Sequence, residues 1–133
     1  GRMIALVGDA ELDEGNIFEA ILEGWKQDLR NCWWIIDYNR QSLDAVIREG
    51  LWARYQALFE AFGWECTEAN GHDARAMFEA AMSRKGARPF VLVGKTVKGR
   101  GVSYMEGVPI WHYRSPNQQE YEQALRELKE IVS

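Results

Sequence analysis

The chain has 133 residues, 47% of them hydrophobic and 27% charged, which is enough for one folded domain with a core. Its formal net charge of −4 is offset by no basic face, which disfavours a general nucleic-acid binder. No apolar stretch approaches the roughly 20 residues of a membrane span, and the N-terminus lacks the regions of a signal peptide. Gly1-Arg2-Met3 leads directly into a predicted strand, so we expect the natural chain to begin earlier. Cys32 and Cys66 have no partners at zinc-ligand spacing and are interpreted as buried, reduced thiols of a cytoplasmic protein.

Apolar runs and helical patterns alternate along the chain. Strands are predicted at 3–7, 32–36, 64–68 and 90–94, and helices at 16–29, 52–62 and 73–83. A last helix opens at Pro116-Asn117, with Asn117 and Glu120 as a capping box. Its inward face is expected to hold Tyr121, Ala124, Leu125 and Leu128. The order predicts an α/β fold, a mostly parallel sheet with flanking helices, in one partial domain over 1–133. Segments 37–48 and 95–115 are predicted loops, and the second has a length that is more often functional than idle.

Polar residues follow the predicted strands where ligands bind to open α/β sheets. Asp9 follows the first strand and Asn39 the second, so their side-chain oxygens should meet at one edge. Such oxygens suit Mg²⁺ or Ca²⁺, and the main-chain carbonyl of Gln41 could add a third ligand. Gly8 and the helix start near Gly15 would offer N–H groups to phosphates. Spacing alone leaves open a plainer interpretation, in which Asp9 caps a helix and Asn39 is a turn residue.

Longer segments around these positions resemble a known family. Gly8-Asp9-Ala10-Glu11-Leu12-Asp13-Glu14-Gly15, followed by Asp37-Tyr38-Asn39-Arg40-Gln41, resembles the diphosphate-binding motif of thiamine diphosphate enzymes, Gly-Asp-Gly and a later Asn. Segment 95–106, Trp111-His112 and Pro116-Asn117 resemble the end of the diphosphate-binding domain of transketolases, especially their split N-terminal subunits. The first two segments are also similar to the homodimeric thiamine component of 2-oxo acid dehydrogenases. The resemblance covers nearly the whole chain.

The resemblance implies a cofactor site of thiamine diphosphate with Mg²⁺ or Ca²⁺. Asp9 and Asn39 would bind the metal by side chain and Gln41 by its carbonyl, while Gly8 and Ala10 would lie against the diphosphate. Ala10 departs from the family glycine, which is acceptable only if its φ is negative.

Further residues are assigned by the same resemblance. Glu14 matches an acid that links the two active sites near the subunit interface, and His112 matches a catalytic-site histidine beside diphosphate and substrate. Tyr113-Arg114 replaces the usual glycine after that histidine. The basic residues of the second loop could touch phosphate or be solvated charges: Lys95, Lys98 and Arg100.

The implied activity is transfer of a two-carbon ketol unit between sugar phosphates. The pyrimidine-binding domain of the family, with its essential glutamate, is not found in the chain. We therefore expect a partner domain or subunit, a homo-oligomeric assembly, and an isolated chain that is inactive and leaves an apolar sheet edge uncovered.

Alternative functions are a thiamine component of a 2-oxo acid (pyruvate) dehydrogenase and a non-catalytic binding or assembly module. A phosphoacceptor domain with Asp9, Asp37 and Lys95 is disfavoured, since Ala10 stands where such domains have a second acid.

Overall fold

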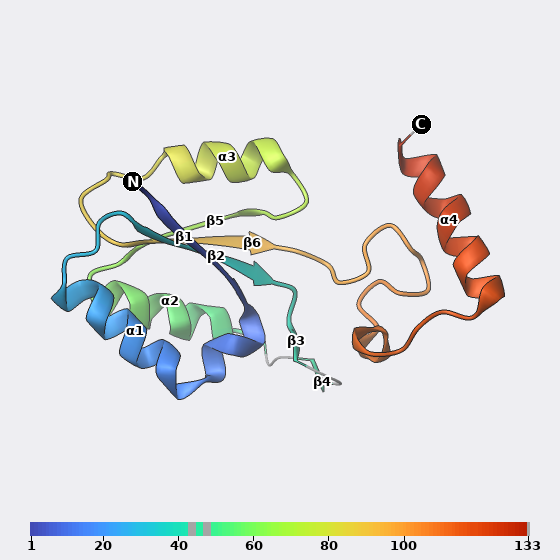
Figure 1. The fold of residues 1–133 in the computed structure, drawn as a ribbon, viewed down its shortest axis with the longest axis horizontal. Helices are drawn as coiled ribbons and strands as arrows, with labels where there is room; N and C mark the ends of the chain where they lie inside the picture. Colours follow the sequence, from blue (N-terminus) through green and yellow to red (C-terminus); the bar gives the residue numbers. More distant parts are fainter. Residues whose placement is uncertain (43–44, 47–48, 133) are drawn as a thin grey trace. The chain divides into compact units, whose positions relative to one another are not determined.

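The structure, a computed structural model, describes residues 1–42, 45–46 and 49–132 (Figure 1). The chain divides into two compact units, which we describe separately. The first comprises Gly1–Arg40 and Arg48–Thr96, and the second comprises Gln41–Ile47 and Val97–Ser133. None of the helices in the described ranges is long and apolar enough to cross a membrane.

A parallel four-stranded sheet forms the centre of the first unit. Its strands are β1 (Met3–Gly8), β2 (Cys32–Tyr38), β5 (Glu65–Asn70) and β6 (Phe90–Lys95), in the spatial order β1-β2-β6-β5. All three pairings are parallel, which confirms the predicted sheet. β2 runs past its predicted end at Ile36, because Asp37 still pairs with Gly8 on one side and Gly94 on the other. The carboxyl ends of β1, β2 and β6 therefore finish level with one another.

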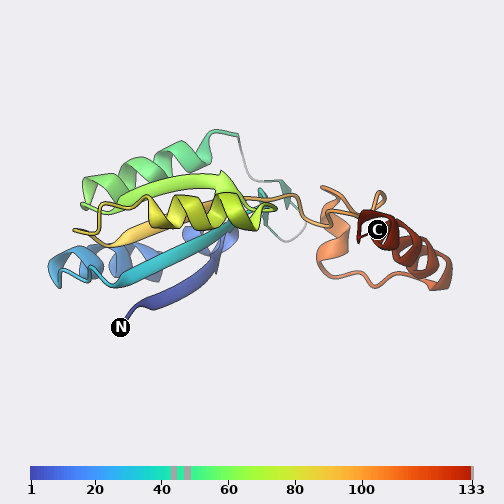
Figure 2. The same cartoon turned by 90° about the horizontal axis from the view of Figure 1, so that it is seen from above.

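Helices cover the two faces of this sheet unequally (Figures 1 and 2). α1 (Gly15–Lys26) and α2 (Leu51–Ala61) lie on one face, and α3 (Ala74–Met82) lies on the other. Trp34 packs with Phe59 and Trp64 in the larger core, whereas Trp33 packs with Phe90 beneath α3. Successive strand residues point to opposite faces, so the tryptophan pair serves both cores.

Helix ends follow backbone conformation more closely than the apolar pattern. α1 stops at Lys26, before its predicted end at Leu29, because Asp28 adopts a left-handed φ of 52°. α2 ends before Gly63, whose φ of 75° is the left-handed geometry that commonly terminates helices. The helix predicted over 52–62 is therefore confirmed to within one residue at each end.

One edge of the sheet carries an uncovered apolar strip. Ile4 and Leu6 of β1 are 58% and 75% exposed. They lie opposite Trp33 and Ile35 in the register, on the α3 side of the sheet, but α3 packs on β5 and β6. This strip, Ile4 with Leu6, confirms the expectation of an uncovered apolar edge.

The second unit contains a short hairpin, a long loop and two helices, one short and one long, within the described residues. The short helix η2 (Pro109–His112) lies in the loop, and α4 (Gln118–Val132) follows it. The capping box is confirmed: Glu120 N–H donates to Asn117 Oδ1 at 3.0 Å, and Asn117 N–H donates to Glu120 Oε2 at 2.8 Å.

The predicted inward face of α4 is largely wrong. Ala124 is buried, but the three larger residues are 40–50% exposed: Tyr121, Leu125 and Leu128. Within its unit α4 contacts the loop through polar groups such as Ser103 with Glu127 and Tyr104 with the Glu120 carbonyl, and these contacts leave the three larger side chains partly exposed. A short hairpin, β3 (Gln41–Ser42) with β4 (Ala45–Val46), also occurs where segment 37–48 was predicted to be loop; residues 43–44 and 47–48 of that segment lie outside the described residues.

Candidate functional site

Asp9 is a buried carboxylate at the carboxyl end of β1. It is only 3% exposed and begins the short helix η1 (Asp9–Asp13). Its Oδ2 accepts the main-chain N–H of Arg40 at 2.5 Å, across 31 positions of sequence. The N–H of Asn39 also stabilises the carboxylate. Parallel pairing of β1 with β2 thus brings Asp9 beside the segment 39–40, as the strand order predicts.

Burial raises the pKa of the Asp9 carboxyl above its ordinary value. Desolvation is the largest cause, and the negative charge of Asp37 acts in the same direction. Main-chain N–H groups of Arg40, Ala10 and Asn39 oppose the shift without cancelling it. A cation beside Asp9 would remove this electrostatic cost. The environment is therefore one that a metal ion would stabilise.

Arg40 has a left-handed backbone with φ of 64°, uncommon for a residue with a side chain. This conformation accompanies the N–H donation to Asp9. The contact of Arg40 with Asp9 was not predicted from the sequence. The position of Arg40 directly after Asn39, in a polar turn, could have indicated it. Strain of this kind often marks functional sites.

Asp37 is the hydrogen-bonding centre of the same edge. Its Oδ2 accepts Asn39 Nδ2 at 3.3 Å, and its Oδ1 accepts the hydroxyl of Thr96. Lys95 forms an ion pair with Glu68. Asp37 orients Asn39 within the turn that also holds Asp9.

The loop after β1 differs in one respect from the prediction. Gly8 N–H donates to Glu11 Oε2 at 2.6 Å, so it is not the available donor that the sequence predicts. Ala10 lies within η1, and among the non-glycine residues that the structure describes only Asp28 and Arg40 have positive φ. Alanine therefore replaces the family glycine without backbone strain. Glu14 is exposed and precedes α1, and it makes no side-chain cap of that helix.

A hollow of about 390 Å³ lies beside this turn within the first unit. Its walls include the aromatic rings of Tyr38 and Trp52 and the side chains of Arg40, Lys95 and Thr96. The carboxyl edge thus combines a recess with oxygen and nitrogen groups.

His112 lies in the second unit, as the last residue of η2, and is exposed. Its Nδ1 is 2.5 Å from the Nζ of Lys98. The preceding Trp111 is fixed, since its indole N–H donates to the carbonyl of Tyr104 at 2.9 Å. Arg114 lies 4.5 Å above the Trp111 ring and pairs with Glu120. Arg114, in the pair Tyr113-Arg114 that replaces the family glycine, therefore holds the segment directly after His112 through contacts with Trp111 and Glu120.

Gln41 opens the hairpin of the second unit, where it pairs with Val46 and is buried. The hairpin was not predicted because each strand has only two residues.

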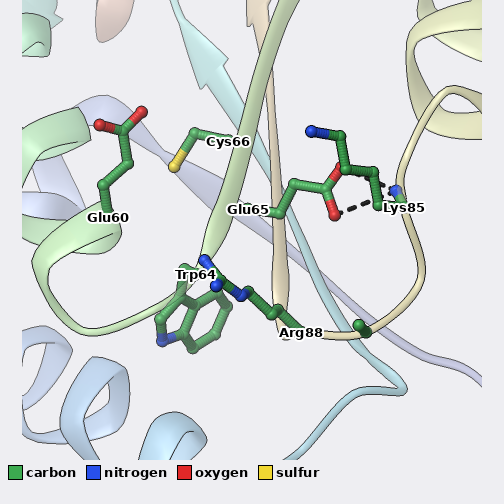
Figure 3. A pocket seen from close by; sticks show the side chains of 7 residues that line it. Glu60, Trp64, Glu65, Cys66, Lys85 and Arg88 are labelled. Carbon is green, nitrogen blue, oxygen red and sulfur yellow. Dashed lines mark hydrogen bonds between the residues drawn. The ribbon is translucent and has the colours of Figure 1, made fainter.

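A second pocket, of about 590 Å³, lies at the opposite, amino end of β5 (Figure 3). Glu65 accepts the N–H of Lys85 at 2.8 Å, and Arg88 and Glu60 also line the pocket. Burial, with nearby carboxylates, raises the pKa of the Cys66 thiol to about 12. Cys66 is therefore protonated and unreactive at neutral pH. It is free and half-buried, and Cys32 is free and buried.

No group of three or more His, Cys, Asp or Glu side chains within 1–42, 45–46 and 49–132 could hold a metal ion. The main chain of Asn39 contacts Asp9, and its side-chain amide donates to Asp37. The amide oxygen of Asn39 is of the type that a hard cation binds.

Comparison with known proteins identifies the family of this chain. The family described as "Transketolase, thiamine diphosphate binding domain" matches residues 2–128. The chain is 36% identical, over 98% of its length, to one subunit of the apulose-4-phosphate transketolase of Phocaeicola vulgatus, and 33% identical, over 96%, to human transketolase. It spans 48% and 20% of those two proteins. Transketolase from Campylobacter jejuni shares the fold, with a TM-score of 0.77 over 96% of this chain and 20% of that one, at 24% identity.

Proposed function

Because the chain belongs to the transketolase family as a thiamine diphosphate binding domain, we propose that it holds the cofactor's diphosphate through a divalent cation at the carboxyl edge of its sheet. In this proposal the side chains of Asp9 and Asn39, with the main-chain carbonyl of Gln41, bind Mg²⁺ or Ca²⁺. The observation that most supports this proposal is the buried Asp9 carboxylate, which lies against the turn that contains Asn39. The main-chain contact of Arg40 keeps that carboxylate in place.

The residues around Asp9 would position the diphosphate. Gly8 and Ala10 lie next to Asp9 in the chain and are proposed to contact the diphosphate. A phosphate oxygen would compete with Glu11 for the Gly8 N–H, so binding requires the Glu11 carboxylate to move. Glu14 is proposed to support the cofactor site at the subunit interface.

Thiamine diphosphate, when bound, supplies the reactive carbon and electron sink for breaking a carbon–carbon bond beside a carbonyl. His112 is proposed as the catalytic residue of this chain, donating a hydrogen bond to the diphosphate or the substrate. The protein's part is to place and polarise these groups.

The complete enzyme is proposed to transfer a two-carbon ketol unit between sugar phosphates in the cytoplasm. Residues 1–133 would form one partial domain of it, since the chain spans about half the length of the apulose-4-phosphate transketolase subunits that it matches. The pyrimidine-binding part would come from a partner domain or subunit, in keeping with relatives that are themselves named as single subunits of a transketolase. The isolated chain should therefore show no turnover.

Calorimetry tests the cofactor proposal. Thiamine diphosphate should bind in the presence of Mg²⁺ and the partner subunit, and EDTA should abolish the heat of binding. Absence of binding both with and without the partner would reject the proposal. Glu65→Gln, at the amino end of the sheet, is the matched control and should bind normally.

The apolar strip Ile4 with Leu6 is proposed to be covered in the oligomer or by the partner subunit. Light scattering at micromolar concentration should show an assembly larger than a monomer, and Leu6→Lys should weaken it. Ile131→Lys, at another exposed apolar position, is the control. A clean wild-type monomer, alone and with the partner present, would contradict this proposal.

A further inference from the structure

Lys98 contacts one particular nitrogen of His112. The Lys98 Nζ lies 2.5 Å from His112 Nδ1, and both residues belong to the second unit. A lysine ammonium has three donors and no acceptor. The ring nitrogen in this contact must therefore accept, and the single ring proton of the neutral imidazole must lie on Nε2.

Both sides of this contact are held by the surrounding loop. The main-chain carbonyl of Lys98 accepts Gly107 N–H at 2.9 Å. Gly99 has φ of 78°, and a Cβ there would lie 2.7 Å from Met105, so only glycine allows this turn. On the other side, Trp111 fixes the short helix that ends at His112. The pairing is thus built into the loop.

We propose that Lys98 is a positioning residue that holds His112 as the Nε2–H tautomer. His112 then presents a hydrogen-bond donor at Nε2, suited to an anionic or carbonyl oxygen, and does not act as a base at that nitrogen. Lys98 is on this account not merely a solvated loop charge. The catalytic role of the His112 Nε2–H donor rests on the proposed function. The assignment of the tautomer does not depend on that function.

Nuclear magnetic resonance of the ¹⁵N-labelled chain tests the tautomer without cofactor. The sequence has only two histidines, so His72→Gln leaves a single imidazole to observe. We expect a proton on Nε2, an unprotonated Nδ1, and a hydrogen-bond scalar coupling between Lys98 Nζ and His112 Nδ1. A proton on Nδ1, or absence of that coupling with no response of Nδ1 to substitution of Lys98, would overturn the proposal.

Substitutions of Lys98 distinguish a positioning role of this residue from a general contribution to the folded structure. Lys98→Met should abolish the coupling and move the Nδ1 resonance to that of a solvated imidazole, and Lys98→Arg should restore part of the shift. Arg100→Met, which removes a neighbouring charge, should leave both unchanged. If Lys98→Met fails to fold, the coupling in the wild-type chain still decides. A chain that shows the coupling but binds no thiamine diphosphate would reject the proposed function and leave the tautomer intact.

Discussion

The two ends of the parallel sheet carry different kinds of polar group. At the carboxyl end, Asp9 is buried with a raised pKa, and Arg40 has a left-handed backbone. At the amino end, a pocket of about 590 Å³ is lined by solvated charges, with the Glu65 carboxylate bonded to main-chain N–H. The larger of these two hollows is thus at the amino end, where the lining carboxylates of Glu60 and Glu65 are not buried.

The buried charge of Asp9, more than the volume of a hollow, therefore distinguishes the candidate site. A buried carboxylate lowers stability unless a bound cation compensates its charge. Cys66, by contrast, is kept as an unreactive thiol.

The largest expected effect is on cofactor binding. Asp9→Ala should weaken Mg²⁺-dependent binding of thiamine diphosphate by on the order of 100-fold or more, because a buried charged partner is lost. Calorimetry against the wild-type chain measures this change. Glu65→Gln, at the other end of the sheet, should alter the affinity less than about twofold. Equal losses in both variants would remove the distinction between the ends.

The backbone at Arg40 should respond to side-chain shape. Arg40→Val should lower the free energy of unfolding by roughly 1–2 kcal/mol, because a β-branched residue is strained in the left-handed region. Arg40→Gly should keep or raise it, since glycine adopts this conformation freely. Urea denaturation measures both changes. A valine variant as stable as the glycine variant would show that Arg40 is not strained.

The pH dependence of stability should reveal the buried Asp9 charge. The folded-state pKa is raised, so the folded chain binds more protons than the unfolded chain in the window above the ordinary value of 3.8. This stabilisation is complete below 3.8 and is lost as the pH rises through the folded pKa. Asp9→Asn lacks the titration, so its stability relative to wild type should increase across that window and then level off. Parallel pH profiles of the two proteins would contradict the shift.

The smallest effect is expected at Cys66. With a pKa of about 12, its thiol should react slowly with iodoacetamide at about pH 8 in the folded chain and quickly in urea. Cys66→Ser should leave cofactor affinity unchanged. Rapid alkylation of the folded protein at Cys66 would show that the amino-end pocket has chemistry of its own.

Much of the fold was predictable because three of its four main strands are continuous apolar runs. Runs 32–36 and 90–94 are buried on both faces, which leaves little polar interruption, whereas run 3–7 forms the exposed edge strand. The extension of β2 through Asp37 was not predictable, because the residue is polar but its backbone stays in the ladder. Segment 37–48 concealed a hairpin whose strands are too short for a periodic signal.

The proximity of Asp9 and Asn39 was predictable, whereas the main-chain contacts of the candidate site were not. Asp9 and Asn39 follow strands that proved to be neighbours, so their proximity could be deduced. The N–H of Arg40 and the occupation of the Gly8 N–H by Glu11 depend on loop conformation, which residue spacing does not determine. The contact of Lys98 with His112 likewise depends on a turn at Gly99.

The most direct test of the account uses Mn²⁺ as a paramagnetic substitute for Mg²⁺. Thiamine diphosphate and Mn²⁺ would be titrated into the ¹⁵N-labelled chain with unlabelled partner subunit, while backbone amide signals are followed. The account predicts that signals of Gly8–Ala10 and Asn39–Gln41 broaden first, while those of Glu65, Cys66 and Arg88 stay sharp. Broadening centred on the amino end of the sheet, or no selective broadening, would contradict it.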